Sequence, residues 1–205
     1  MLQNLILAST SPYRRELLNR LGVPFRCVAP PIYEEAFKRD DLAPAALAAY
    51  LAEVKAESVA KLEPNAIVIG CDQLVACEGS ILGKPGSAAG AVEQLWSLAG
   101  RSHELITALV VIQGERREQH IDIATLHMRR LTDAEIAGYV ALDDPHDCAG
   151  SYKLERHGIA LFESIDSRDH SAITGLPLIA LTTILRGFGI QIPPTDLTRK
   201  PQSLT

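Results

Sequence analysis

The sequence predicts an α/β fold. Short apolar runs typical of strands alternate with longer segments of helical periodicity, and the chain contains no internal repeat. A chain of 205 residues fits one ordinary domain and is long enough to bury a sizeable core. These observations favour an α/β arrangement over a helical bundle or a β-sandwich.

The first elements are a strand, a short turn and a helix. The run "NLILAS" (residues 4–9) is typical of a buried strand. Ser11 is placed to cap the helix that follows, and Pro12 suits its first position. Gly22 and Pro24 then end this helix.

A long helix is expected over residues 43–62, which are rich in helix formers. Its apolar stripe consists of Leu47, Leu51, Val54 and Leu62. Lys55 lies beside this stripe.

The middle of the chain continues the alternation. Two strands are expected at residues 66–77 and 80–85, joined at Glu78 and Gly79, and a helix at residues 89–100. Residues 103–113 and 119–131 are predicted to form a hairpin around "GERRE".

The last third begins with a helix over residues 132–142, because Thr132 and Glu135 have the spacing of a capping box. Short strands are expected near residues 148–154 and 158–163. A loop at residues 174–179 leads into a last helix that ends near Arg186. From Gln191 we expect a loose polar tail, residues 191–205.

Composition excludes several classes of partner. The formal charge of −5 gives no basic excess for holding polymeric nucleic acid, although local arginines can still bind one small anion. The four cysteines form no CxxC pair, which indicates reduced thiols and neither a disulfide framework nor a zinc site. No basic leader and no apolar run of about 18 residues is present. We therefore expect a cytoplasmic protein without membrane contact.

Hydroxyl and guanidinium groups gather at the predicted start of the first helix. Ser9, Thr10 and Ser11 lie where unpaired backbone N–H groups and a partial positive charge favour an anion. Arg14 or Arg15 can add a bidentate grip on phosphate. The alternative is that the hydroxyls only cap the helix and that the arginines are solvated.

Asp72 follows an apolar run, a position where α/β sheets place chemistry. A carboxylate there can hold magnesium or accept a proton from water, or it can simply close a turn. Glu34 or Glu35 can supply a second carboxylate for the metal; the alternative is a solvated loop.

Two lysines are further candidates for binding phosphate. Lys55 and Lys84 can each reach phosphate oxygens as point charges, although surface lysines are usually only solubilising.

Seven strings occur in one order along the chain: "LILASTSPYRREL", the glutamate at 34, "AEVKA", "IGCDQ", "GKP", "CAGSY" and "GLPL". In this order they resemble the Maf-like nucleotide pyrophosphatases, from about Leu5 to Leu185. The resemblance implies one catalytic domain over residues 1–190, with a mixed sheet, flanking helices and two lobes around a central cleft, as in the inosine-triphosphate pyrophosphatases. It also implies hydrolysis of nucleoside triphosphates with a divalent cation, Mg²⁺ first, with Mn²⁺ or Co²⁺ as alternatives.

The same resemblance assigns roles to individual residues. It makes Asp72 the proton acceptor and places the metal on Glu34 and Asp72. It places the phosphates on Ser9, Ser11, Arg14, Arg15, Lys55 and Lys84. The chain departs from the family pattern at Tyr33, where an aspartate is common, so Glu34 and Glu35 both stay open as metal ligands.

Three positions distinguish branches of the family, and here they are Tyr13, Gln73 and Glu155. An aromatic residue, a glutamine and a glutamate resemble the branch that acts on 7-methyl-GTP. A methylated guanine is cationic, so Tyr13 can hold it by a cation–π interaction and Glu155 can accept its N–H groups. The alternatives are a surface aromatic and a solvated turn.

The predicted function is hydrolysis of 7-methyl-GTP to 7-methyl-GMP and pyrophosphate, with Asp72 as general base. Two other functions remain open: a non-catalytic nucleotide-binding regulator of cell division, and a nucleotidyl transferase. A homodimer agrees with the base rate for soluble enzymes.

Overall fold

The computed structural model describes residues 4–37 and 39–195, and the chain forms two compact units. Unit 1 lies within Met1–Asp72, Thr107–Asp122 and Asp169–Thr205. Unit 2 consists of Gln73–Ile106 and Ile123–Arg168. The polypeptide therefore crosses between the units several times.

The predicted mixed α/β fold is confirmed. Among the described residues, seven strands form one mixed sheet in the order β2-β1-β3-β5-β6-β7, with β4 paired to β3. The strands are β1 (Leu5–Leu7), β2 (Arg26–Cys27), β3 (Ile67–Cys77), β4 (Ser80–Leu82), β5 (Ser102–Gln113), β6 (Arg116–Met128) and β7 (Phe162–Asp166). Strands β3, β5 and β6 each contribute residues to both units.

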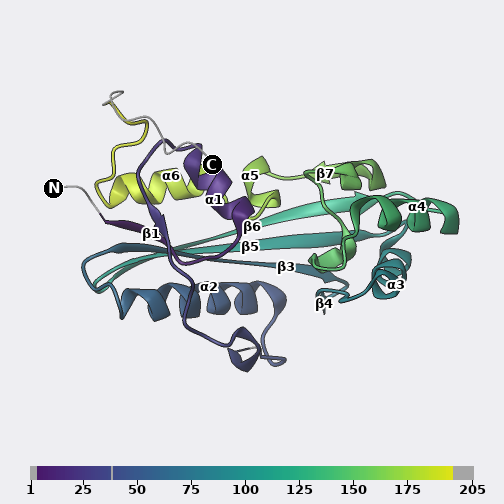
Figure 1. Ribbon diagram of the computed structural model, residues 1–205, viewed down its shortest axis with the longest axis horizontal. Helices are drawn as coiled ribbons and strands as arrows, with labels where there is room; N and C mark the ends of the chain where they lie inside the picture. The colour runs from purple at the N-terminus through teal and green to yellow at the C-terminus, as the bar shows by residue number, and fades with distance from the viewer. Residues whose placement is uncertain (1–3, 38, 196–205) are drawn as a thin grey trace. The chain divides into compact units, whose positions relative to one another are not determined.

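In unit 1, β1 pairs in parallel with both β2 and β3. Helices α1 (Pro12–Asn19) and α6 (Leu178–Gly187) cover one face of these strands, and α2 (Pro44–Ala60) covers the other (Figure 1). The core between these strands and helices α1 and α6 is aliphatic. It includes Leu5, Leu7, Leu17, Leu18, Ile67, Ile69, Leu181 and Leu185.

Helix α1 has the predicted start. Ser11 adopts extended backbone and its hydroxyl accepts the N–H of Arg14, while Pro12 occupies the first helical position. The capping part of the sequence analysis is therefore confirmed.

Helix α2 packs against the sheet at Gly70. A Cβ at Gly70 would collide with the carbonyl oxygen of Ala52, so only glycine allows this close approach. The predicted stripe is wrong at Leu62, which is 65% exposed because the helix ends at Ala60. Lys55 lies within the buried face, not beside it.

The hairpin between β5 and β6 is tighter than predicted. Its turn consists of Gly114 and Glu115, and Gly114 has a φ of 58°, which suits a two-residue turn. The rest of "GERRE" belongs to β6, and Arg117 there pairs with Glu57 of α2 at 2.6 Å.

Unit 2 contains helices α3 (Ala88–Leu98) and α4 (Asp133–Asp143), which contact each other. The predicted capping box at the start of α4 is confirmed: the Thr132 hydroxyl accepts the N–H of Glu135, and the Glu135 carboxylate accepts the N–H of Thr132.

The strands predicted at residues 148–154 and 158–163 are wrong for most of their length. The first contains the 3₁₀ turn η2 (Ala149–Ser151), and the second lies largely in η3 (His157–Leu161), with β7 starting at Phe162. Gly150 and Ser151 have φ values of 77° and 59°, which extended backbone cannot adopt.

The remaining short elements of unit 1 are η1 (Glu34–Phe37) and α5 (His170–Ile173). Ile192 is buried in the unit 1 core, so the start of the predicted tail packs on the protein; residues 196–205 lie outside the described residues.

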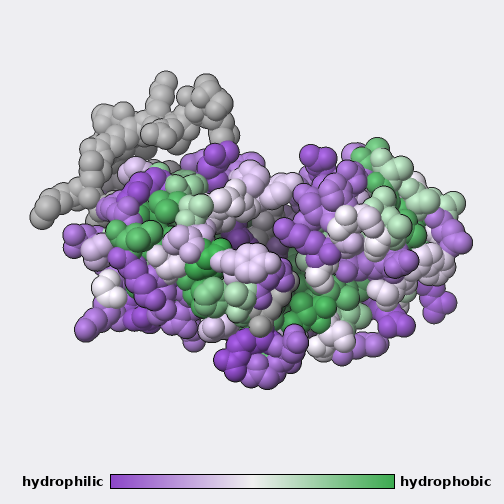
Figure 2. Space-filling view, turned by 60° about the horizontal axis from the view of Figure 1, so that its bottom comes forward, coloured by the Kyte–Doolittle hydropathy of each residue, from purple (hydrophilic) through white to green (hydrophobic). Residues whose placement is uncertain are grey.

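The next feature is the hydropathy of the surface. The face in Figure 2 is mainly hydrophilic, and hydrophobic residues form small separate areas on it. Within the described ranges, no helix combines the length and apolarity that crossing a lipid bilayer requires.

Candidate active site

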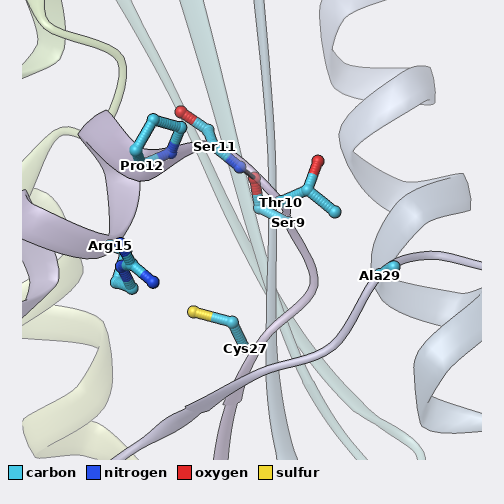
Figure 3. A pocket seen from close by; sticks show the side chains of 7 residues that line it. All are labelled: Ser9, Thr10, Ser11, Pro12, Arg15, Cys27 and Ala29. Carbon is cyan, nitrogen blue, oxygen red and sulfur yellow. Dashed lines mark hydrogen bonds between the residues drawn. The ribbon is translucent and has the colours of Figure 1, made fainter.

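A small pocket lies at the start of helix α1. Its walls are Ser9, Thr10, Ser11, Pro12, Arg15, Cys27 and Ala29 (Figure 3). The side chains of Arg15 and Cys27 point toward one another there. Desolvation raises the pKa of the Cys27 thiol, and the Arg15 charge opposes that effect. The predicted grouping of hydroxyls with an arginine at this helix start is therefore present in the structure.

The hydroxyls of this pocket have local partners. Ser9 is buried and its Oγ accepts the N–H of Ser11 at 3.1 Å, and the Ser11 Oγ accepts the N–H of Arg14 at 3.3 Å. Because both oxygens act as acceptors in these bonds, their own O–H hydrogens can still be donated. Capping and anion binding are therefore compatible at these residues.

Arg14 is held apart from the pocket lining. Its Nε donates to the carbonyl oxygen of Gly175 at 3.0 Å, and the Cys71 thiol donates to the same oxygen at 3.1 Å. Gly175 has a φ of 110°, which requires glycine. The shared carbonyl brings Arg14 beside the residue that precedes Asp72.

The turn that carries Gly175 is fixed by Asp169. One Asp169 oxygen accepts the N–H and O–H of Ser171, and the other accepts the N–H of Ile179. The Ser171 hydroxyl in turn accepts the N–H of Leu178. These bonds hold both ends of the loop between α5 and α6.

Strand register places Asp72 near the pocket. Leu7 pairs with Ile69, and the next residue, Ala8, donates its N–H to the Ile69 carbonyl at 2.8 Å. The turn at Ser9 therefore leaves the sheet beside the residues that lead to Asp72. The strand predicted over residues 66–77 is confirmed as β3, and Asp72 lies inside it, so Asp72 does not stand at the carboxyl end of a strand, where α/β sheets usually place chemistry.

Asp72, Lys55 and Glu34 form one charged cluster. The Lys55 Nζ lies 2.5 Å from the Asp72 Oδ1 and 2.8 Å from the Glu34 Oε2. Asp72 is 4% exposed and Lys55 is 8% exposed, whereas the Glu34 side chain is about half exposed. The sequence predicted all three residues, and the structure adds that one ammonium group joins the two carboxylates.

The electrostatics of Asp72 reflect its burial. Burial raises the pKa of the Asp72 carboxyl, while the charges of Lys55 and Arg14 act to lower it. The effect of burial is the larger one. A carboxylate with a raised pKa accepts protons more readily than an exposed aspartate.

The second oxygen of the Asp72 carboxylate differs from the first. Oδ2 is buried and has no hydrogen-bond partner among residues 4–37 and 39–195. A buried acceptor without a partner is costly unless a ligand completes it. The oxygen therefore suits a proton, a cation or a bound water supplied with the substrate.

The donor set fits a divalent cation that is shared with a ligand. Glu34 and Asp72 supply two hard carboxylates that contact the same Lys55 ammonium group, and Mg²⁺ is usually held by one or two carboxylates plus substrate phosphates. Across residues 4–37 and 39–195, no group of three or more His, Cys, Asp and Glu side chains could form a complete protein site. Of the two glutamates left open by the sequence, Glu34 is the one paired with Lys55.

The other predicted residues are distributed over both units. Tyr13 is on α1 in unit 1 and is 37% exposed. Gln73, Lys84 and Glu155 belong to unit 2, where Lys84 and Glu155 are exposed and Gln73 is half-buried.

Two residues of the pocket have no role in the sequence-based prediction. Thr10 is predicted only as one of three hydroxyl residues, and Cys27 lies on β2, whose two residues are too few for an alternation pattern. The string "GLPL" was noted, but the part played by the Gly175 carbonyl depends on a contact 161 positions away in the sequence.

Comparison with known proteins identifies the family of this chain. A family model described as "Maf-like protein" matches residues 4–188. A 7-methyl-GTP pyrophosphatase of Bdellovibrio bacteriovorus is 51% identical over 188 residues, which cover 92% of this chain and 98% of that protein. One of Bordetella avium is 49% identical over 186 residues, covering 91% and 93%.

A solved structure, a HAM1 protein from Coxiella burnetii, has a similar fold, with a TM-score of 0.51 and 15% identity over 90% of this chain and 99% of that one. The family model covers residues 4–188, and the two relatives are aligned over more than nine-tenths of this chain. The chain belongs to the Maf-like protein family.

Proposed function

We propose that this chain hydrolyses 7-methyl-GTP to 7-methyl-GMP and pyrophosphate. The observation that carries the chemistry is the buried Asp72, paired with Lys55 on one oxygen and open on the other. The choice of substrate is supported by the relatives in Bdellovibrio and Bordetella, which are named 7-methyl-GTP pyrophosphatases.

The reaction is an attack by water on the α-phosphorus. A new bond forms between the water oxygen and the α-phosphorus, and the bond from that phosphorus to the bridging oxygen of the β-phosphate breaks. Pyrophosphate leaves with the electrons of the broken bond. The open Oδ2 of Asp72 takes the proton that the water loses.

Lys55 has two roles in this scheme. The charge of its ammonium group opposes the rise in the Asp72 pKa that burial causes, and its contact with Oδ1 leaves Oδ2 for the attacking water. Its contact with Glu34 holds the second carboxylate at the same point.

Glu34 and Asp72 would hold a divalent cation, Mg²⁺ or alternatively Mn²⁺ or Co²⁺. Such an ion supplies neutralisation of the charge that develops on the phosphate oxygens. The two carboxylates then orient the triphosphate relative to the proton acceptor.

Phosphate binding is assigned to the groups at the start of α1 and to the lysines. Ser9, Ser11 and Arg15 line the pocket, and Arg14 stands beside Cys71 and Asp72. Lys84 in unit 2 is assigned the same role through the family resemblance. Because phosphoryl transfer depends chiefly on positioning and charge neutralisation, we expect these residues to affect rate as well as affinity.

Base recognition is assigned to Tyr13, Gln73 and Glu155. Tyr13 is exposed enough to offer a ring face to a cationic methylated guanine. Glu155 is exposed and its carboxylate can accept the N1–H and amino group of the base. Gln73 follows Asp72 directly in β3, where alternation directs it to the opposite face of the strand.

We also propose a cytoplasmic location and no polymeric nucleic-acid partner. The four cysteines are free thiols, which suits a reducing compartment, and the net charge is −5. A homodimer stays a proposal that gel filtration with light scattering would test.

The function is tested by pyrophosphate release from 7-methyl-GTP, GTP, UTP and TTP, with Mg²⁺ and with a chelator. We expect the fastest release from 7-methyl-GTP and a large loss with the chelator. Binding without release from any of these triphosphates would identify a non-catalytic regulator. Release coupled to transfer of the nucleotide to an acceptor would identify a nucleotidyl transferase.

A further inference from the structure

Glu155 sits on a short loop, residues 153–158, which we name the Glu155 loop. The loop follows η2 and ends inside η3. Glu155 itself is exposed, but residues near the two ends of the loop bind the end of helix α4: Lys153 is buried, and the exposed His157 contacts the buried Asp143. All of these groups lie in unit 2.

The first contact between the loop and α4 is made by Lys153, which is only 9% exposed. Its Nζ donates to the carbonyl oxygens of Asp143 and Asp144 at 3.3 and 3.0 Å and pairs with the Asp147 carboxylate at 3.1 Å. An ammonium group at the last carbonyls of α4 also interacts favourably with the helix dipole. The backbone N–H of Lys153 donates to the Tyr139 hydroxyl at 2.9 Å.

The second contact between the loop and α4 is made by His157. Its Nδ1 lies 2.6 Å from the Asp143 Oδ1, and its backbone N–H donates to the Asp143 Oδ2 at 3.1 Å. Asp143 is 2% exposed, so this carboxylate is buried at the end of α4. Both of its oxygens bind the Glu155 loop, one through a side chain and the other through the backbone.

The loop is also closed on itself. The N–H groups of Arg156 and Gly158 both donate to the Lys153 carbonyl oxygen at 3.0 Å. A Cβ at Gly158 would lie 2.6 Å from that oxygen, so glycine is needed for this approach. The backbone on each side of Glu155 is therefore fixed by bonds that do not involve its own side chain.

We propose that Asp143, together with His157 and Lys153, is a positioning set that orients Glu155 toward the methylated base and so sets the preference for 7-methyl-GTP. This inference rests on the proposed function. A buried carboxylate with both oxygens bound to one loop restricts that loop more than ordinary surface packing does. A loop ordered in advance saves the entropy that Glu155 would otherwise lose when the base binds.

The test compares steady-state kinetics on 7-methyl-GTP and UTP for the full chain and for Asp143→Asn. The variant keeps the size of the side chain but weakens both bonds to His157. We expect the KM for 7-methyl-GTP to rise by about 10-fold and its kcat to stay nearly constant. The KM for UTP should rise by about 3-fold or less. Equal changes on both substrates would overturn the proposal.

Two further variants separate positioning from folding. His157→Ala removes the side-chain donor to Asp143, and His157→Asn restores an N–H group near the position of Nδ1. We expect His157→Ala to lose selectivity and His157→Asn to recover part of it at equal melting temperature. Asp144→Asn is the matched control, because the Asp144 side chain binds His146 and not the loop. It should change the ratio of the two KM values by less than about twofold.

A double-variant cycle separates this inference from the proposed function. If Asp143 acts through Glu155, Asp143→Asn should add little to the loss already caused by Glu155→Gln. Additive losses would overturn the positioning role while leaving the pyrophosphatase intact. Absence of pyrophosphate release by the unmodified chain would instead remove the proposed function, and the inference with it.

Discussion

Asp72 in unit 1 and Asp143 in unit 2 are both buried carboxylates, but their hydrogen bonding differs. In unit 1 the Lys55 ammonium group contacts the Asp72 carboxylate directly, and the other oxygen of Asp72 has no hydrogen-bond partner among the described residues. In unit 2 both oxygens of the Asp143 carboxylate accept hydrogen bonds from His157, while the nearby Lys153 ammonium group binds backbone carbonyls and a different carboxylate.

The difference separates a reactive group from a structural one. A buried acceptor without a partner is stable only where the rest of the site holds it in place, and it is available to a substrate. A carboxylate with both oxygens hydrogen-bonded is held in place and fixes the backbone around it. We therefore propose that unit 1 supplies catalysis and that the Asp143 carboxylate in unit 2 orders the Glu155 loop.

The largest expected effect is the loss of turnover in Asp72→Asn. An amide cannot accept the proton of the attacking water, so kcat should fall by about 1,000-fold or more on every triphosphate. Binding of the triphosphate, measured by calorimetry, should change only a few-fold. Asp41→Asn is the control, because Asp41 is an exposed carboxylate of the same unit. Turnover by Asp72→Asn close to that of the control would remove Asp72 from its role.

The next effect is on stability. Lys55→Met leaves Asp72 buried without its cation, which should lower the free energy of unfolding by about 3–5 kcal/mol. Adding Asp72→Asn should recover much of that loss, because the uncompensated charge is then gone. Urea unfolding followed by circular dichroism measures both. Lys61→Met, at the exposed end of the same helix, should change stability by less than about 0.5 kcal/mol. A Lys55 variant as stable as that control would contradict the buried pair.

A smaller effect is the pH dependence of stability that His103 in unit 2 should cause. Burial lowers the pKa of His103 to about 4 from its ordinary value of 6.5. As pH falls through this window, the unfolded chain binds a proton that the folded chain resists, so stability decreases from pH 6.5 toward pH 4. The contribution is about 3 kcal/mol.

His103→Gln keeps a partner for the Tyr152 hydroxyl but does not titrate. Unfolding is followed by fluorescence of Trp96, the one tryptophan in the sequence, which lies on α3 in unit 2. The variant should lose less stability than the unmodified chain between pH 6.5 and pH 4. Parallel pH profiles for the two proteins would show that His103 is not the titrating group.

The smallest effect concerns Tyr13. Tyr13→Leu should raise KM for 7-methyl-GTP by about 2- to 30-fold, which corresponds to a cation–π contribution of about 0.5–2 kcal/mol, and Tyr13→Phe should raise it less. Tyr33→Leu is a control at another exposed tyrosine of unit 1. If Tyr13→Leu and Tyr33→Leu behave alike on 7-methyl-GTP and UTP, the ring of Tyr13 does not contact the base.

Local signals in the sequence were sufficient for much of the fold. The Ser11 cap and the capping box of α4 depend on residues within three positions of one another, and both were predicted correctly. The segments around Gly150 and Gly158 were predicted as strands and are 3₁₀ turns. Gly150 and Ser151 have positive φ values, and the N–H of Gly158 donates to the Lys153 carbonyl oxygen, features that composition does not reveal.

The candidate site also contains both predicted and unpredicted features. Residue types and order were enough to select Asp72, Lys55 and Glu34, but not to show that one ammonium group joins the two carboxylates. The Gly175 carbonyl and the Asp143 anchor were not predicted, because each acts through a contact between segments that are distant in sequence or irregular in conformation.

The most direct test measures kcat/KM on 7-methyl-GTP and UTP side by side for Asp72→Asn and Glu155→Gln. Catalysis in unit 1 and base selection in unit 2 predict that Asp72→Asn lowers both values by the same large factor. They predict that Glu155→Gln lowers the value for 7-methyl-GTP alone. The account is contradicted if Asp72→Asn still releases pyrophosphate at a near-normal rate, or if Glu155→Gln affects both substrates equally.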